Sequence, residues 1–533
     1  MVRMKRSRGS IWAGLVLLSV LPAFAQAEVI VKTQAGLVAG SGGEIHIWKG
    51  IPYAQPPTGA LRWKPPQLVA PWPGIRRALD FGPMCPQGNP DQLKPDMRED
   101  CLNLNVWSGA KSGEKLPVFV WIHGGGFVGG SDRIDGVPLA RQGIVVVAIN
   151  YRLGVLGFMA HPELTAESAH HASGNYGLMD QIAALHWVQD NITAFGGDSE
   201  RVTIGGASAG GTSVGYLLAS PLAKGLFQAA WLDSASRLFL PDPGLSKTLH
   251  GLTPMEDVGL EIASHIQDLR ALGTAEVMER AARVTDELYG EGGRGKIGLK
   301  PESRVHMTTM PDRPWWAFTD GYVMPDELYD MYRSGRFNHA ACLVGTCKDE
   351  GLNFTRKTPD LTVDGYKDYL RKYYPVICTK MFKTYPGKTP EEIRAAITRT
   401  ITDFMFLYGS IRVADFEAAA RQSVYVERFV RVPPGSLGAL HGADGAYLLG
   451  TVRAGSAAGQ GKYVAEDETL SDQMVQRLAA FVKGLNPNPE HAVPLWPAWT
   501  PKQREYLEIG DRVQVRAFQD QAILNMFRKQ LGE

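Results

Sequence analysis

Residues 202–211, VTIGGASAGG, decide how the rest of the chain is interpreted. The apolar run before Gly206 is typical of a buried strand, and the residues after Ser208 suit a helix. The spacing from Gly206 to Gly210 matches G-x-S-x-G, in which a serine occupies a sharp strand–helix turn and exposes its hydroxyl as a nucleophile. Such a turn leaves no room for side chains at the two glycines. The alternative is a glycine-rich loop that only packs tightly, because a chain with 59 glycines can contain this spacing by chance.

Strand-like and helix-like segments alternate along the chain. Apolar runs expected to be strands lie at 116–124, 144–152, 201–206, 229–234 and 341–346. These runs are apolar on both faces, so we expect a mostly parallel central sheet flanked by helices. Helices are expected at 177–192 and 470–484, and the more polar stretch 240–340 fits helical cap insertions over the sheet. Residues 28–533 are therefore predicted to form a single α/β domain.

A second glycine-rich segment, WIHGGGF (121–127), follows a strand candidate. Three consecutive glycines allow the backbone to approach a substrate and to direct bare amides toward an oxygen that becomes negatively charged. The segment is of the HGGG oxyanion-loop type. A phosphate-binding loop is excluded because no Lys-Ser or Lys-Thr pair follows. This context favours Ser208 as a nucleophile over Ser208 as a packing residue.

A serine nucleophile of this type needs an acid and then a histidine later in the chain. Asp349 and Glu350 lie just past a late strand candidate, and these residues alone do not decide between them. His441 lies in the small-residue segment LGALHGADG, which lets an imidazole ring approach other segments closely. His491 lies in a proline-rich surface stretch that is ill suited to holding a ring in place. We therefore expect His441 to be the base.

The first 27 residues form a separate segment. Four basic residues among the first eight precede an apolar stretch and then small residues, which predicts a secretory signal peptide (residues 1–27) cleaved near Ala25–Ala27. The alternative is an uncleaved anchor, but the apolar run is shorter than the roughly 20 residues that a span needs. Cleavage lowers the formal charge from +1 to −3, because it removes four basic residues and no acidic ones. We expect a secreted or periplasmic protein with no nucleic-acid partner and no stable membrane insertion.

The five cysteines suggest structural roles. Cys85 and Cys101 are 16 residues apart and flank a loop with proline and glycine, so their spacing suits closure of a surface loop. Cys342 and Cys347 lie in one apolar run, and on a strand their Cα atoms would be about 16 Å apart, too far for a disulfide. The odd count requires at least one free thiol, and three are expected. No histidine lies at a familiar spacing from them, so no catalytic cysteine is expected.

From about residue 30 to its C-terminus the chain resembles the type-B carboxylesterase family, which includes cholinesterases and bacterial carboxylesterases. The segments that carry the resemblance are FGGDSERVTIGGASAG (195–210), EDCLNLNVW (99–107), KGIPYAQPPTGALRWKPP (49–66) and NYRLGVLGF (150–158). The resemblance implies an α/β-hydrolase fold and a secreted bacterial serine carboxylic-ester hydrolase. Its substrate would be a small-molecule ester, cleaved through an acyl-enzyme without a metal or other cofactor.

The resemblance also assigns site residues. It implies a triad of Ser208, Glu350 and His441, and so selects Glu350 over Asp349. It further implies oxyanion amides at Gly125, Gly126 and Ala209, a supporting serine at Ser234, and a disulfide between Cys85 and Cys101.

Two departures from the family bear on the substrate. Most members carry glutamate where this chain has Ala207, beside the nucleophile, and in cholinesterases that carboxylate helps to attract a cation. The loop between Cys85 and Cys101 also has no aromatic residue, whereas cholinesterases have a tryptophan there that stacks on choline. Recognition of a quaternary ammonium needs such an aromatic face. A cholinesterase is therefore not expected.

Aromatic and basic residues give the remaining substrate hypotheses. Phe127, Trp315 and Trp316 are candidate pocket residues, with plain core packing as the alternative. Arg237 offers a positive charge that could recognise an ester bearing a carboxylate. Bacterial relatives that remove tricarballylate side chains from fumonisins would need such a basic residue. An esterase specific for polycarboxylate, fumonisin-like side-chain esters is thus an alternative function. The sequence is also compatible with a non-catalytic binding protein of the same fold and with an amidase or lactonase, and it does not indicate an oligomeric state.

Overall fold

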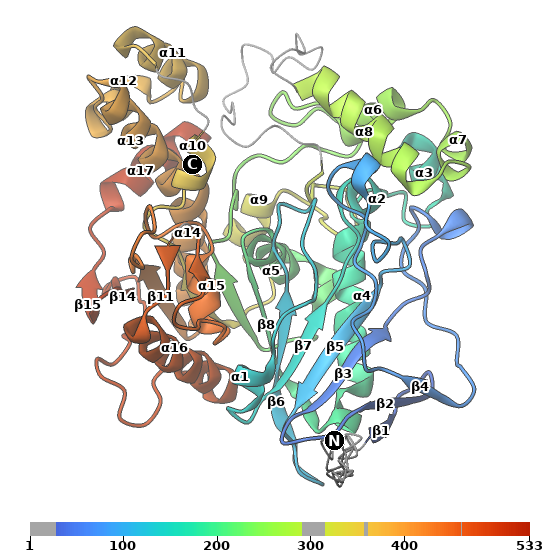
Figure 1. Cartoon of the computed structure of the whole chain (residues 1–533). Coiled ribbons are helices and arrows are strands. Elements are labelled where there is room, and N and C mark those ends of the chain that lie inside the picture. The colour runs from blue at the N-terminus through green and yellow to red at the C-terminus, as the bar shows by residue number, and fades with distance from the viewer. Residues whose placement is uncertain (1–27, 290–314, 357–360, 460) are drawn as a thin grey trace, which may run out of the picture.

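A long mixed sheet forms the centre of the molecule (Figure 1). The computed structural model describes residues 28–289, 315–356, 361–459 and 461–533. The strands are β1 (Glu28–Lys32), β2 (Leu37–Ser41), β3 (His46–Pro52), β4 (Ile75–Arg77), β5 (Asn103–Ser108), β6 (Leu116–Ile122), β7 (Val145–Ile149), β8 (Gly197–Ala207), β9 (Ala229–Asp233), β10 (Ala341–Gly345), β11 (Val424–Phe429), β14 (Glu505–Ile509) and β15 (Val513–Ala517). Their order is β1-β2-β3-β5-β7-β6-β8-β9-β10-β11-β14-β15, and β4 pairs with β2. A separate pair consists of β12 (Ala457–Ala458) and β13 (Gly461–Lys462).

The centre of the sheet is parallel, as predicted. Neighbours from β7 across β6, β8, β9, β10 and β11 to β14 pair in parallel. The strands toward both edges pair antiparallel, except that β4 pairs in parallel with β2. Four of the predicted apolar runs contain one central strand each, and the fifth, 201–206, lies within the longer strand β8. Because all parallel strands run the same way, the loops that follow β6, β8, β10 and β11 meet at one edge.

Helices cover both faces of the sheet, which explains why the central strands are apolar throughout. Alternate residues of β6 belong to two different hydrophobic cores. One core includes residues of α4 (Tyr176–Asn191), α5 (Ala209–Ala219) and α14 (Tyr408–Ala419). The other includes residues of α1 (Val137–Ala140) and α16 (Ala465–Gly484). The helices predicted at 177–192 and 470–484 correspond to α4 and α16.

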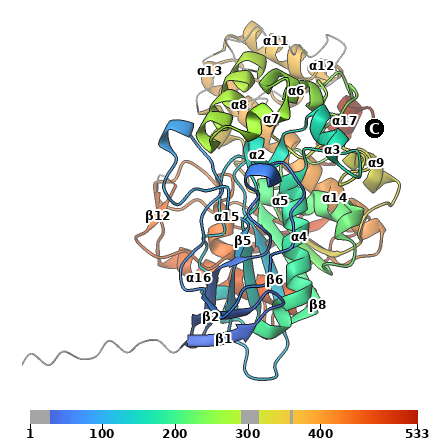
Figure 2. The ribbon, with the colours of Figure 1, turned by 90° about the vertical axis from the view of Figure 1, so that its right-hand side faces the viewer.

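Two groups of helices lie at the same end of the molecule (Figure 2). The predicted cap stretch supplies α6 (Met255–Ile262), α7 (Ile266–Arg270), α8 (Thr274–Tyr289) and α9 (Leu328–Arg333), while its residues 290–314 lie outside the described part. A second group, which the sequence pattern did not indicate, consists of α11 (Val363–Tyr373), α12 (Cys378–Thr384) and α13 (Pro390–Ile401). A π-helical segment, Thr402–Leu407, joins α13 to α14.

The remaining helices are α2 (Gly154–Phe158), α3 (Pro162–Glu167), α10 (Leu352–Thr355), α15 (Ala443–Leu448) and α17 (Gln521–Leu531). The predicted signal peptide, residues 1–27, lies outside the described residues. None of the helices in the described ranges has the length and apolar character needed to span a membrane. Cys342 and Cys347 are buried and unpaired, and they belong to the two different cores, as expected for side chains on opposite faces of a strand. Cys378 is also unpaired.

Candidate active site

Ser208 occupies the turn between β8 and α5. Its backbone has φ 59° and ψ −125°, a conformation that non-glycine residues adopt only when the surroundings hold it. The Ser208 amide donates to the carbonyl of Asp233 at 2.9 Å, which anchors the turn to the neighbouring strand. A Cβ atom on Gly206 would lie 2.5 Å from the Ile122 carbonyl oxygen, and one on Gly210 would lie 2.0 Å from it. Both glycines are therefore required by close backbone packing.

Three side chains from different strand ends form one hydrogen-bonded chain. The Ser208 Oγ is 2.8 Å from Nε2 of His441, and Nδ1 of the same ring is 2.5 Å from Oε2 of Glu350. Glu350 is fully buried, and its other oxygen accepts from the Ser234 hydroxyl at 2.7 Å and from the Cys347 amide at 2.8 Å. These contacts leave the carboxylate one orientation, with Oε2 facing the imidazole.

Asp349 has a different position from its neighbour Glu350. Its Oδ2 accepts from the amide of Ala439 at 2.9 Å, and its own amide donates to the Ala439 carbonyl at 3.0 Å. Asp349 thus holds the loop that carries His441, while Glu350 contacts the ring. His491 is exposed at the surface.

The HGGG segment lies directly against the Ser208 turn. A Cβ on Gly124 would be 2.5 Å from the Ala207 carbonyl oxygen and 3.0 Å from the Ser208 Cβ. Gly125 and Gly126 have φ values of 109° and 63°, which favour glycine. Within the described residues nothing accepts a hydrogen bond from the amides of Gly125, Gly126 or Ala209. Unpaired amides beside a nucleophile are suited to binding an oxyanion.

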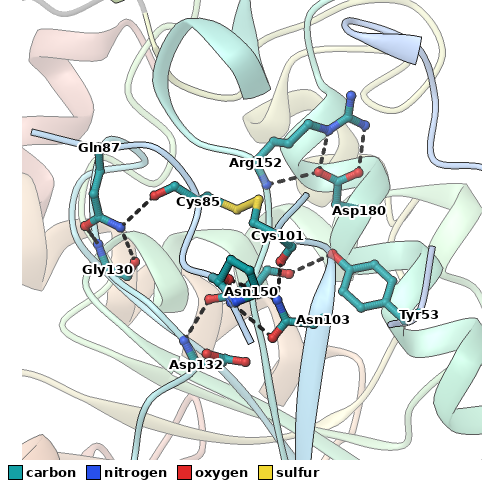
Figure 3. Close-up of a disulfide and its surroundings, with 11 residues drawn as sticks. Tyr53, Cys85, Gln87, Cys101, Asn103, Gly130, Asp132, Asn150, Arg152 and Asp180 are labelled. Atoms are coloured by element: carbon teal, nitrogen blue, oxygen red, sulfur yellow. Dashed lines mark hydrogen bonds and ion pairs between the residues drawn. A yellow bond between two sulfur atoms is a disulfide. The ribbon is translucent and has the colours of Figure 1, made fainter. Parts of the chain in front are cut away.

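A disulfide loop contacts Gly130, shortly after this segment (Figure 3). Cys85 and Cys101 are bonded, and both are buried. The side chain of Gln87, inside the loop, donates to the carbonyls of Cys85 at 3.1 Å and Gly130 at 2.8 Å. A side chain on Gly130 would collide with the Gly124 carbonyl oxygen at 2.3 Å. The disulfide loop is therefore coupled to the glycine segment, a link that no motif in the sequence indicated.

The three aromatic pocket candidates differ in position. Phe127 is fully buried, with Phe158 and Trp316 at 5.0 and 5.2 Å between ring centroids. All three belong to the main core, so packing accounts for Phe127 and Trp316. Trp315 also lines a cavity of about 570 Å³ together with Val128 and Gly129, which follow the glycine segment. Trp315 thus borders a cavity next to that segment.

Arg237 lies near the site without an ion pair. It is half-buried, and within the described part of the chain its guanidinium makes no hydrogen bond or ion pair, although its positive charge acts on the buried carboxyl group of Asp242. The group lies over Trp316 at 4.7 Å, and its amide donates to the Met405 carbonyl at 2.8 Å. Phe406, next in the chain, contacts the His441 ring at 4.7 Å. Arg237 is thus a cation without a direct ion pair in the described residues, beside elements that touch both Phe127 and His441.

Buried acids behind the site were not anticipated. Asp233, Asp444 and Glu427 are almost inaccessible to solvent, and burial followed by mutual repulsion raises the pKa of Asp233 well above its ordinary range. Burial also raises the pKa of Asp444 and of Glu427. Ala207, by contrast, is half-buried beside Asp233 in the register of β8 and β9. The carboxyl groups near this serine therefore come from β9, β11 and α15 rather than from the residue before it.

Comparisons with known proteins identify the family and the fold. The sequence model of the carboxylesterase family matches residues 27–527. A fumonisin B1 esterase of Sphingopyxis macrogoltabida is 37% identical over 84% of this chain and 81% of its own length. A para-nitrobenzyl esterase of Bacillus subtilis is 32% identical over 91% of this chain and 96% of its own. The crystal structure of Geobacillus stearothermophilus carboxylesterase EST55 superposes with a TM-score of 0.78 at 29% identity, covering 93% of this chain and 99% of that one.

Proposed function

The chain belongs to the carboxylesterase family and is a carboxylic ester hydrolase, and we propose that it acts through Ser208, His441 and Glu350 as a serine triad. The observation that carries the proposal is the continuous contact from Ser208 Oγ to His441 Nε2 and from His441 Nδ1 to Glu350 Oε2. Each member comes from a different strand end, and each is held by independent contacts.

In this mechanism His441 Nε2 removes the Ser208 proton as Oγ attacks the ester carbonyl carbon. The carbonyl oxygen becomes an oxyanion, which the amides of Gly125, Gly126 and Ala209 stabilise. The tetrahedral intermediate then expels the alcohol, which takes the proton from His441 and leaves an acyl-enzyme. Water, deprotonated by the same imidazole, attacks the acyl carbon and releases the carboxylic acid. Glu350 orients the ring and stabilises the imidazolium.

The test of the triad is the hydrolysis of p-nitrophenyl acetate and butyrate by wild type and Ser208→Ala. Loss of a nucleophile that acts within a triad lowers kcat by on the order of 10⁶-fold. Ser213→Ala is the matched control, because Ser213 lies on α5 and its Oγ accepts from Gln181 rather than from the triad. Equal rates for wild type and Ser208→Ala would refute the proposal.

We propose further that residues 1–27 are cleaved and that residues 28–533 act as one exported domain. The basic and apolar pattern of the N-terminus supports export, and so does the Cys85–Cys101 disulfide, because disulfides persist in oxidising compartments. N-terminal sequencing of the protein recovered from the periplasm and from the medium tests both the cleavage site and the compartment.

A second candidate, an esterase for substrates that bear carboxylates, is favoured by one specific observation. Arg237 is half-buried, and within the described residues its guanidinium makes no direct ion pair or hydrogen bond, although its charge acts on Asp242; partial desolvation without a direct partner is unfavourable for a guanidinium. A carboxylate on the substrate would supply a direct partner. The similarity to a fumonisin B1 esterase fits polycarboxylate side-chain esters of the fumonisin type.

This candidate is tested with p-nitrophenyl hemiesters of succinic, glutaric and adipic acid against uncharged p-nitrophenyl butyrate. Arg237→Gln is expected to lower kcat/KM about tenfold for the best hemiester and less than threefold for the butyrate. Arg421→Gln is the control, since Arg421 has a similar positive φ but follows α14 on the surface. Equal losses on charged and neutral esters would identify Arg237 as structural.

A further inference from the structure

Two buried aspartates connect the turn of Ser208 to the loop of His441. Asp233 is the last residue of β9, and its carbonyl holds the Ser208 amide at 2.9 Å. Asp444 lies in α15, three residues after His441. The two side chains are 0% and 1% exposed, so solvent cannot satisfy them.

Each aspartate has one oxygen near a polar hydrogen and one without a partner. Oδ1 of Asp233 lies 3.3 Å from the Ser234 hydroxyl, whose single proton is shared with Glu350 at 2.7 Å, and Oδ1 of Asp444 accepts from the Gly445 amide at 3.0 Å. Within the described residues neither Oδ2 has a donor. The Oδ2 of Asp233 faces the start of α15, because a Cβ on Gly445 would lie 3.9 Å from it. Oδ2 of Asp233 thus lies beside the helix that carries Asp444, and the two carboxyl groups interact with each other.

The surrounding charges make two ionised carboxylates at this place costly. Glu350 and Glu427 add negative charge, the Cys347 thiol contacts Asp444, and the positive charge of Arg477 acts on Glu427. Burial, followed by the neighbouring carboxylates, raises the pKa of Asp233. A buried pair of this kind releases its last proton only at alkaline pH.

We propose that Asp233 and Asp444 share one proton between their Oδ2 atoms and act as positioning residues that hold His441 against Ser208. The proposal rests on the proposed roles of Ser208 and His441. One proton satisfies both oxygens that lack a donor and ties α15 to the end of β9. Because β9 also holds the Ser208 amide, the pair fixes the nucleophile and the base relative to each other. Loss of the proton at alkaline pH leaves two buried like charges, which separate α15 from β9 and lower kcat.

The test is the pH profile of kcat and KM from pH 6 to 10 with p-nitrophenyl butyrate. In Asp444→Asn the amide donates to the Asp233 carboxylate, so one hydrogen bond remains while the second ionisation is removed. In Asp233→Asn the new amide donates to the Asp444 carboxylate, so this variant also keeps one hydrogen bond and removes the second ionisation. Both variants are expected to lose the alkaline fall in kcat that wild type shows. Asp444→Ala is expected to lower kcat at least tenfold with KM changed less than threefold, and Asp444→Asn to recover most of that loss.

Glu417→Gln is the matched control. Glu417 is equally buried, and burial raises its pKa to about 8, but it lies on α14 against Ala340. Its variant is expected to keep the wild-type profile. The proposal is overturned if wild-type kcat stays level to pH 10, if both asparagine variants keep the alkaline fall, or if Glu417→Gln removes it. Melting temperatures identify variants that fail to fold, and an active Ser208→Ala would refute the triad itself instead.

Discussion

Gln87 and Gly130 hold each other through two hydrogen bonds. Nε2 of Gln87 donates to the Gly130 carbonyl at 2.8 Å, and the Gly130 amide donates to Oε1 of Gln87 at 2.8 Å. Gly130 in turn packs against Gly124, which is in close contact with the Ser208 turn. The disulfide loop and the proposed oxyanion amides therefore form one mechanical unit, although they are far apart in the sequence.

Removal of the disulfide should lower both stability and activity. For Cys85→Ala with Cys101→Ala we expect a loss of about 2–4 kcal/mol in the free energy of unfolding, because the loop regains conformational freedom when unfolded. We also expect kcat to fall several-fold, since Gln87 no longer holds Gly130. Thermal unfolding and p-nitrophenyl butyrate turnover measure the two effects. Cys378→Ala, at an unpaired cysteine, is the control; a double variant as stable as this control would contradict the prediction.

Glu350→Gln and Asp349→Asn separate the two adjacent acids. Glu350→Gln should lower kcat by on the order of 10³- to 10⁴-fold, because a neutral amide neither fixes the His441 tautomer nor stabilises its positive charge. Asp349→Asn should lower it less than tenfold, since its oxygen can still accept from the Ala439 amide. The measurement is kcat at saturating p-nitrophenyl butyrate. A larger loss in Asp349→Asn would reverse the assignment.

The positions of several site residues were predictable because they follow from the geometry of parallel strands and from the glycine motif around Ser208. Parallel strands bring their carboxyl ends to one edge, so the residues just past the predicted strands 201–206 and 341–346 were expected to lie near one another, whereas β11, which precedes the His441 loop, was not among the predicted strands. Gly206 and Gly210 are required by close backbone contacts at the Ser208 turn. This requirement is visible in the sequence as the G-x-S-x-G motif. The choice of His441 over His491 followed from the small residues beside it, and His491 is indeed at the surface.

Other features left no such signature. The helices at 363–401 are amphipathic and could cover any apolar surface, so their place beside the cap depends on tertiary packing alone. Gln87 has a partner 43 residues away, and no local pattern encodes that contact. In the sequence Asp233 and Asp444 look like ordinary polar residues, because their burial depends on the tertiary packing around the end of β9 and α15. The sequence alone does not distinguish a substrate-pocket role from a core-packing role for Phe127 and Trp316.

Asp132 should make the protein less stable as pH rises. It is fully buried, both side-chain oxygens lack a partner within the described residues, and burial raises its pKa to about 8. The unfolded carboxyl has a pKa of about 4, so between about pH 4 and 8 the folded state binds more protons and stability falls with rising pH. Asp132→Asn removes this dependence. Its melting temperature should exceed that of wild type by more at pH 9 than at pH 5; an equal difference at both values would contradict the prediction.

Ala207→Glu should shift the enzyme toward cationic esters. Ala207 is half-buried next to Ser208 and pairs with Asp233 in the sheet, so a carboxylate here lies among other acids beside the nucleophile. A charge about 6 Å from a substrate cation at an effective dielectric near 20 contributes on the order of 1–3 kcal/mol, and screening reduces this. We expect about a fivefold rise in kcat/KM for acetylthiocholine relative to its uncharged isostere 3,3-dimethylbutyl thioacetate. Ala207→Gln has the same size without the charge, so an equal rise in that variant would show that shape rather than electrostatics is responsible.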